Sequence, residues 1–165
     1  MHVELTINDS PRELFVDESE SLATALRRAG HTEVLCGCDG GTCGVSKVFV
    51  DDEVRMACGM DALEADGTAV RTVQALGRQD ALHPIQQAFI DHHAVQCGFC
   101  IPGMIIEAAA LLEENPDPSP ETVRAAIDDT LCRCTGYQKP VQAILDAAER
   151  LRTPPVADDG VIANE

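Results

Sequence analysis

Two stretches of the chain decide its fold, QCGFCIPGM at residues 96–104 and LCRCTGY at residues 131–137. The first holds a C-x2-C pair and the second a C-x-C pair. Thiolate is a soft ligand, and four of them select zinc or an iron–sulfur centre over hard cations. A structural zinc ion stays open on spacing alone. A helix expected to begin near Pro102 would point its positive end at the sulfurs, which favours an anionic cluster. The four cysteines are Cys97, Cys100, Cys132 and Cys134.

A second group of cysteines lies in a glycine-rich loop of the first half: Cys36, Cys38, Cys43 and Cys58. Dense glycine suits a backbone that wraps closely around an inorganic core and directs N–H groups at its sulfurs. The plant-type ferredoxin spacing is C-x4-C-x2-C followed by a distant cysteine. Cys38, Cys43 and Cys58 match three of these positions, Ser46 stands at the remaining one, and Cys36 is additional.

The first half of the chain predicts a small α+β domain. Apolar and polar residues alternate over residues 3–7 and 14–16 around a turn at 9–11, which predicts a hairpin. Ser21 caps an expected helix that stops at Gly30. Further strands are expected over residues 48–50, 54–57 and 70–73, with the domain ending at residue 76 and residues 77–80 as the connector.

From residue 81 the apolar spacing becomes helical. Four helices are expected, over residues 82–93, from Pro102 to about residue 112, over 122–129 after a Ser119 cap, and over 141–151. Short helices with cysteine pairs in their connections predict a four-helix bundle over residues 77–152 that holds a metal. Residues 153–165 are acidic and lack periodicity, which predicts a disordered tail.

Composition narrows the function classes. The net charge is −16, with 28 acidic residues against 12 basic ones, so no nucleic-acid binding is expected. The sequence shows no leader-like apolar run and no stretch long enough to span a bilayer, so no membrane insertion is expected and a cytoplasmic location is. In a reducing compartment, eight cysteines at these spacings favour metal binding over disulfides.

At these motifs the chain resembles the iron–sulfur subunit of the molybdenum hydroxylases, the family of xanthine dehydrogenase, aldehyde oxidoreductase and carbon monoxide dehydrogenase. The resemblance covers about residues 3–151, and the segments 72–76 and 82–86 add to it. It implies a β-grasp ferredoxin-like domain followed by a four-helix domain, each with one [2Fe-2S] cluster. It also implies a large subunit that holds molybdopterin next to the helical-domain cluster, and a flavin (FAD) subunit or external acceptor beyond the other cluster.

Residue by residue, the resemblance implies that the cysteines at 97, 100, 132 and 134 ligate the helical-domain cluster, and that Gln96 and Cys134 approach the pterin. It further implies that Cys38, Cys43 and Cys58 ligate the second cluster, where Ser46 replaces the family's remaining cysteine. Residues 128–130 also depart from the family pattern.

Three outcomes are open for the second cluster. Cys36 can replace the missing ligand, because a short glycine-containing segment has the reach and freedom. Ser46 can ligate through its alkoxide, a harder donor that must lose a far less acidic proton. The cluster can also be incomplete or absent.

The resemblance implies that the function is electron transfer from a molybdopterin site through two [2Fe-2S] clusters to a flavin or external acceptor. The chain would then be a part of an oxidoreductase with no catalytic residues of its own. The alternatives are a free-standing two-cluster ferredoxin and a zinc-stabilised interaction module without redox function.

Overall fold

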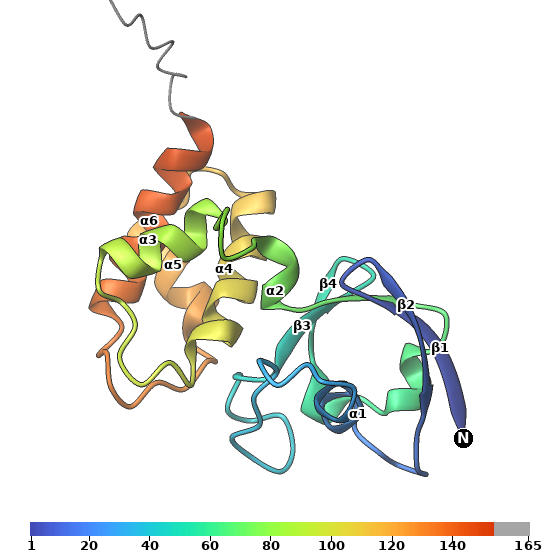
Figure 1. Ribbon diagram of the computed structural model, residues 1–165. Helices are drawn as coiled ribbons and strands as arrows, with labels where there is room; N and C mark the ends of the chain where they lie inside the picture. The colour runs from blue at the N-terminus through green and yellow to red at the C-terminus, as the bar shows by residue number, and fades with distance from the viewer. Residues whose placement is uncertain (154–165) are drawn as a thin grey trace, which may run out of the picture.

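The structure is a computed structural model that describes residues 1–153. This part of the chain contains one mixed sheet of five strands and six α-helices, of which the last four gather on one side of the sheet (Figure 1). The strands are β1 His2–Ile7, β2 Ser10–Phe15, β3 Lys47–Val50, β4 Glu53–Met56 and β5 Ala69–Arg71. The helices are α1 Leu22–Arg28, α2 Val73–Leu76, α3 Pro84–Asp91, α4 Ile101–Glu114, α5 Pro120–Ile127 and α6 Gln138–Arg152, with 3-10 turns η1 Ala57–Gly59 and η2 Ala62–Ala65.

The sheet has the order β2-β1-β5-β3-β4. The β1–β5 pair is parallel, and the other three pairs are antiparallel. Asn8 and Asp9, with φ of 47° and 63°, close the predicted hairpin in a two-residue turn, because two left-handed residues match the twist of the strands. The turn therefore begins one residue before the expected residues 9–11, and Pro11 belongs to the edge strand β2, where a missing N–H is tolerated.

Strand β3 is buried on both faces, because its side chains alternate between two cores. Val48 and Val50 join the core beneath α1, together with Leu22 and Leu26. Phe49 points the other way, into the core built mainly by α3 to α6. One strand thus belongs to both halves of the molecule.

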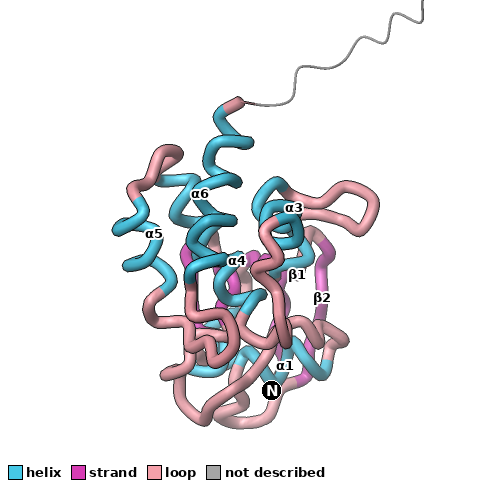
Figure 2. Tube along the Cα trace, turned by 90° about the vertical axis from the view of Figure 1, so that its left-hand side faces the viewer, coloured by secondary structure: helices cyan, strands magenta, loops and turns pink. Residues whose placement is uncertain are grey.

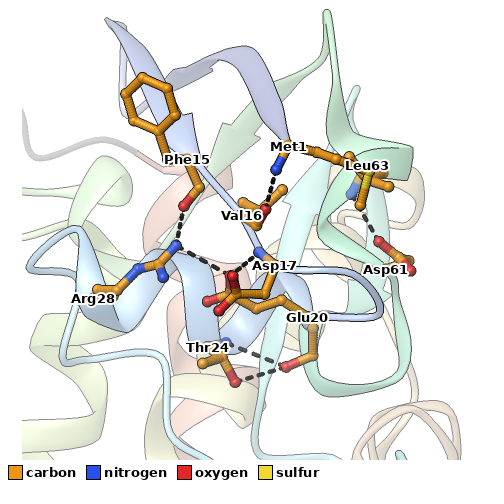
Figure 3. Close-up of polar contacts among 10 residues, drawn as sticks. Met1, Phe15, Val16, Asp17, Glu20, Thr24, Arg28, Asp61 and Leu63 are labelled. Carbon is orange, nitrogen blue, oxygen red and sulfur yellow. Dashed lines mark hydrogen bonds and ion pairs between the residues drawn. The ribbon is translucent and has the colours of Figure 1, made fainter.

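Polar contacts hold α1 against the hairpin (Figure 3). The Ser21 hydroxyl accepts a hydrogen bond from the Thr24 N–H at 3.3 Å, which caps the helix as predicted. At the other end, Arg28 donates to the backbone carbonyl of Phe15 and to Glu20 Oε2, the latter at 3.1 Å. Gly30, with φ of 102°, follows the last turn and confirms the predicted stop.

The four helices predicted in the second half are present, with shifted ends. Caps decide the shifts: His83 and Ser119 cap α3 and α5, and each is followed by proline in the first turn. The expected strand over residues 70–73 was wrong at its end, because Thr72 caps the one-turn helix α2 and β5 stops at Arg71. Figure 2 shows α3, α4, α5 and α6 above the loops that carry the cysteines.

The two halves pack closely at two glycines. A Cβ on Gly44 would lie 2.3 Å from the carbonyl oxygen of Asp129, and a Cβ on Gly103 would lie 2.5 Å from that of Gly44. Lys47 also crosses the contact, with its Nζ 2.6 Å from Glu107 and 2.5 Å from Asp129. Its side chain is 2% exposed, so a paired ammonium is buried where the two halves meet.

Among the described residues, no helix is both long and apolar enough to cross a membrane. The tail predicted for residues 153–165 lies, apart from Thr153, outside the described residues.

Candidate metal centres

The four cysteines of the second half come together between the α3–α4 loop and the α5–α6 loop. Cys97 and Cys134 are exposed, and their sulfurs are 3.6 Å apart. Cys100, which is buried, forms a hydrogen bond with Cys132. Two sulfur pairs from two loops match the donor arrangement of a two-iron centre, in which each iron takes two protein ligands.

Helix ends and one tyrosine fix these loops. Cys100 is the residue before α4, whose first N–H groups therefore face the sulfurs. The Tyr137 hydroxyl accepts from the Cys132 N–H at 2.8 Å and donates to the Thr130 carbonyl at 3.0 Å. The Thr135 hydroxyl lies 3.0 Å from Cys132 Sγ. The C-x-C segment is thus held on both sides.

Three thiols of this group, Cys100, Cys132 and Cys134, have displaced pKa values. Burial, followed by the hydrogen bond to Cys132, raises the pKa of Cys100 to about 12. Burial also pushes the pKa of Cys132 upward, but hydrogen bonds from Thr135 outweigh it and lower that pKa overall. The hydrogen bond with Cys97 raises the pKa of Cys134. Such coupling is expected where thiols crowd around one ligand-binding point.

In the first half, Cys38 and Cys43 form a pair at the ends of the glycine-rich loop. The Thr42 N–H donates to Cys38 Sγ at 3.3 Å. Hydrogen bonds from the Thr42 side chain and from Cys43 lower the pKa of Cys38 to about 5, so its thiolate forms readily. Cys43 is buried, and its backbone forms part of the contact with the second half.

Cys58 lies in η1, directly after β4, next to Ser46. The Cys58 N–H donates to the Ser46 hydroxyl at 3.3 Å, and Ser46 is 1% exposed. Ser46 occupies the third position of the ferredoxin spacing, and a residue at that position is expected to lie beside the distant cysteine, here Cys58.

Cys36 is exposed and lies two residues before Cys38. Burial raises its pKa, and so do the charges of Cys58, Cys43 and Cys38, whereas Arg27 lowers it. All three other cysteines of the loop are thus within electrostatic range of the Cys36 thiol.

The two cysteine groups are neighbours in space. The N–H of Leu131, the residue before Cys132, donates to the carbonyl of Cys43 at 2.9 Å. The Phe99 ring lies against Gly37, where an added Cβ would come within 3.0 Å of Phe99 Cε1. Figures 1 and 2 both show the three cysteine loops at the same end of the molecule.

The outer side of the second group is open and apolar. Gln96 and Cys134 are exposed, and three exposed apolar residues surround them in sequence: Val95 at 42%, Phe99 at 44% and Leu131 at 62%. These three residues form an apolar rim. Isolated exposed side chains are ordinary, but three beside one site indicate a contact surface.

Sequence reasoning missed three residues that shape these sites: Thr135, Arg27 and Lys47. Thr135 could have been noticed because it directly follows a ligand-like cysteine, whereas Arg27 and Lys47 gave no signal in the sequence. Within residues 1–153, no three or more His, Cys, Asp or Glu side chains converge as the ligands of one metal ion would.

The chain matches two domain families. Residues 5–74 match the 2Fe-2S iron-sulfur cluster binding domain, and residues 72–145 match the [2Fe-2S] binding domain. The nicotine 6-hydroxylase small subunit of Paenarthrobacter nicotinovorans is 42% identical over 148 residues, which are 89% of each chain. The crystal structure of quinoline 2-oxidoreductase from Pseudomonas putida 86 contains a chain with a TM-score of 0.88 and 39% identity, over 94% of this chain and 98% of that one.

A third relative is larger. The aldehyde oxidoreductase of Megalodesulfovibrio gigas is 42% identical over 87% of this chain, but the match spans only 16% of that protein. The same unit therefore occurs both as a separate subunit and as part of a longer chain.

These matches define the class of protein as a carrier of two [2Fe-2S] clusters. The chain belongs to the family of iron–sulfur small subunits of the molybdenum-containing hydroxylases. Members of this class are electron-transfer parts of an oxidoreductase and are not catalytic themselves. The resemblance drawn from the two cysteine motifs is confirmed.

Proposed function

We propose that this chain carries electrons between a molybdopterin-binding catalytic subunit and a further acceptor, with one [2Fe-2S] cluster in each half. The observation that carries the proposal is that each cysteine of the α3–α4 loop lies beside a cysteine of the α5–α6 loop, Cys97 beside Cys134 and Cys100 beside Cys132. When bound, each cluster would accept and donate one electron at a time, so two in one chain would form a relay.

Cys97, Cys100, Cys132 and Cys134 would hold the cluster of the second half. The pairing of Cys97 with Cys134 and of Cys100 with Cys132 supports this, since it provides two thiolates for each of two irons. A single tetrahedral zinc ion would need all four donors at one point. The N-terminus of α4 would stabilise the negative charge of the thiolates.

Cys38, Cys43 and Cys58 would hold the cluster of the first half together with a fourth donor. The low pKa of Cys38 and the Gly-rich backbone around it support cluster binding there. The fourth donor is the least ordinary part of this set, because Ser46 stands where the family spacing has cysteine.

A large molybdopterin-binding partner would cover the open side of the second group. Gln96 and Cys134 are exposed there, so a pterin could reach them, and the apolar rim would be buried in the interface. Relatives named as small subunits support such a partner. The acceptor beyond the first-half cluster would be a flavin subunit (FAD) or an external protein.

We further propose two domains, a β-grasp ferredoxin-like domain over residues 1–76 and a four-helix bundle of α3 to α6 over residues 77–152. The meeting of the two family matches at residues 72–74 supports this boundary. A cytoplasmic location is proposed as well, because eight cysteines at metal-ligand spacings are typical of a reducing compartment.

Purification of the native complex tests the proposal. The untagged partners that co-purify with the tagged chain should bring molybdenum, and the reduced complex should show two distinct iron–sulfur signals in electron paramagnetic resonance. Colourless protein with bound zinc would contradict it, and red-brown protein that never brings a larger subunit would identify a free-standing ferredoxin instead.

The interface can be tested separately with two exposed apolar residues. Leu131→Glu places a charge in the apolar rim and should abolish co-purification of molybdenum, since an unpaired charge in a buried interface is costly. The matched control is Phe15→Glu, which changes a 72% exposed residue on the edge strand β2 and should leave the complex intact. Equal molybdenum content in both variants would exclude the rim as the interface.

A further inference from the structure

The cysteines of the first half form one complete pair and one incomplete pair. Cys38 and Cys43 are hydrogen-bonded to each other. Cys58 lies instead beside Ser46, with its N–H donating to the Ser46 hydroxyl. A [2Fe-2S] cluster bound only by Cys38, Cys43 and Cys58 would lack a donor on the Cys58 side.

Ser46 is poorly placed to become that donor. An oxygen ligand must sit closer to a metal than a sulfur ligand does, by about 0.1–0.3 Å in zinc sites. The Ser46 backbone cannot shift inward easily, because its carbonyl accepts the Ala57 N–H at 3.1 Å and the β3–β4 ladder begins at the next residue, Lys47. Its hydroxyl is also a harder donor that must first lose its proton.

Cys36 has the freedom that Ser46 lacks. Among the backbone hydrogen bonds of the described chain, none involves Cys36, Gly37 or Cys38. Gly37 has no side chain to hinder rotation, and it already lies against Cys43, whose sulfur would be 3.2 Å from an added Cβ. The segment can therefore reorient Cys36 without breaking secondary structure.

The charges around Cys36 also suit a ligand. Arg27 lies near enough to the Cys36 thiol to act on its charge. Arg27 is fixed nearby, because its Nη1 donates to the Thr32 carbonyl at 2.9 Å and to the Val34 carbonyl at 2.8 Å. A fixed guanidinium stabilises negative charge on thiolates and on the cluster that they would hold.

We propose that Cys36 supplies the fourth thiolate of the first-half [2Fe-2S] cluster, in place of the residue at position 46. The thiol proton leaves to solvent on ligation, and no oxidation or reduction is required. This inference rests on the proposed function, because it assumes a cluster in the first half. The fourth donor then precedes Cys38 in the cysteine loop, whereas in the family spacing it follows Cys43 at position 46.

Iron content and spectra of the purified complex test this ligand set. The wild-type chain should contain about four iron ions, two in each cluster. Cys36→Ala should lose about half of this iron and the first-half signal, while the second-half signal remains as an internal control for folding. Cys36→Ala/Ser46→Cys should regain both, and Ser46→Ala should resemble the wild type.

The outcomes separate this inference from the proposed function. Wild-type protein without iron would overturn both. Two irons in the wild type that rise to four in Ser46→Cys would show that the wild type lacks the first cluster, which overturns the ligation by Cys36 and the two-cluster relay but leaves electron transfer through the second-half cluster standing. Loss of the cluster in Ser46→Ala with no effect of Cys36→Ala would assign the role to Ser46. If Cys36→Ala misfolds, recovery in the double variant decides for the inference and failure to recover decides against it.

Alkylation gives a readout that is independent of spectra. Iodoacetamide should not modify Cys36 in the iron-loaded wild type, because a ligating thiolate is protected, but it should modify Cys36 after iron is removed by a chelator. Mass spectrometry of the peptide that contains residue 36 measures this. Modification of Cys36 in protein that retains about four irons would overturn the inference.

Discussion

At the scale of single residues, the histidine that begins α3 has a specific chemical state. The N–H of Ile85 donates to His83 Nδ1 at 3.3 Å, and the backbone N–H of His83 donates to Gln86 Oε1 at 2.9 Å. Only a neutral ring with an unprotonated Nδ1 can accept such a bond. Burial lowers the pKa of His83, although the charge of Glu113 opposes this effect. The cap of α3 therefore requires the neutral form of His83.

Acidification should weaken the fold through this residue. The unfolded chain takes up a proton on His83 near pH 6.5, whereas the folded chain does so only at lower pH. The contribution is thus fully present above about pH 6.5 and is lost as the pH falls from there to the folded-state pKa. His83→Asn keeps a capping acceptor without a titrating ring, so its urea midpoint should fall less between pH 7.5 and 5.5. Parallel curves for both proteins would contradict this.

The sequence predicts the candidate ligands but not the contacts between them, because spacing is local and contacts depend on tertiary structure. Cysteine spacing is a local property of the chain, so it indicated all eight candidate ligands and the unusual position of Ser46. The pairing of Cys97 with Cys134 depends on how two distant loops meet, which spacing does not encode. Charged residues are expected outside, and Lys47 is buried only because Glu107 and Asp129 come to it through tertiary structure.

At the scale of elements, the loop before β3 depends on one glycine. Gly44 has φ of 71°, and a Cβ there would lie 2.3 Å from the backbone oxygen of Asp129. The position therefore combines a left-handed conformation with a close backbone approach between the two halves. Neither strand nor helix periodicity reveals such a contact, so the tight packing of the halves could not be predicted from sequence.

Gly44→Ala should cost about 2 kcal/mol or more, because a left-handed alanine costs about 1–2 kcal/mol and an unrelieved clash adds to it. Gly67→Ala is the matched control for the conformation alone, since Gly67 has φ of 75° and no atom within 4 Å. Gly40→Ala, which has open space and no positive φ, should be nearly neutral. Anaerobic urea unfolding followed by circular dichroism measures all three. Equal losses in Gly44→Ala and Gly67→Ala would show that the close approach carries no cost.

The length of a helix decides whether its apolar spacing can be recognised in the sequence. The longer helices α4 and α6 have enough turns for periodicity to predict them. The one-turn helix α2 does not, and it exists because Thr72 is buried and held by Asn8 and Glu33 as well as capping Gln74. Its position is a consequence of the assembled fold.

At the scale of the whole molecule, one buried ammonium joins the halves. The Lys47 side chain is 2% exposed, while those of Glu107 and Asp129 are 25% and 57% exposed. The lysine comes from the sheet, and its two partners come from α4 and from the loop after α5. Because the lysine alone is fully removed from water, the pairing protects mainly its charge.

Glu107→Gln/Asp129→Asn should therefore destabilise the protein by about 3–5 kcal/mol, since it leaves a buried charge unpaired. Lys47→Met should cost less, because it keeps an apolar stem and leaves two carboxylates that can reach solvent. Asp52→Asn, which breaks an exposed pair with Arg71 at 2.7 Å, is the control and should cost at most about 1 kcal/mol. Urea midpoints decide, and a double variant as stable as the control would contradict the prediction.

The double burial of β3 also sets an order of events during synthesis. The ribosome releases the first half of the chain before residues 85–129 exist, and in that interval Phe49 and Lys47 have nothing to cover them. The N-terminal cysteine loop is then open at the place where Leu131 later binds the Cys43 carbonyl. The enclosure of the first cysteine loop therefore waits for the helical half to close over it.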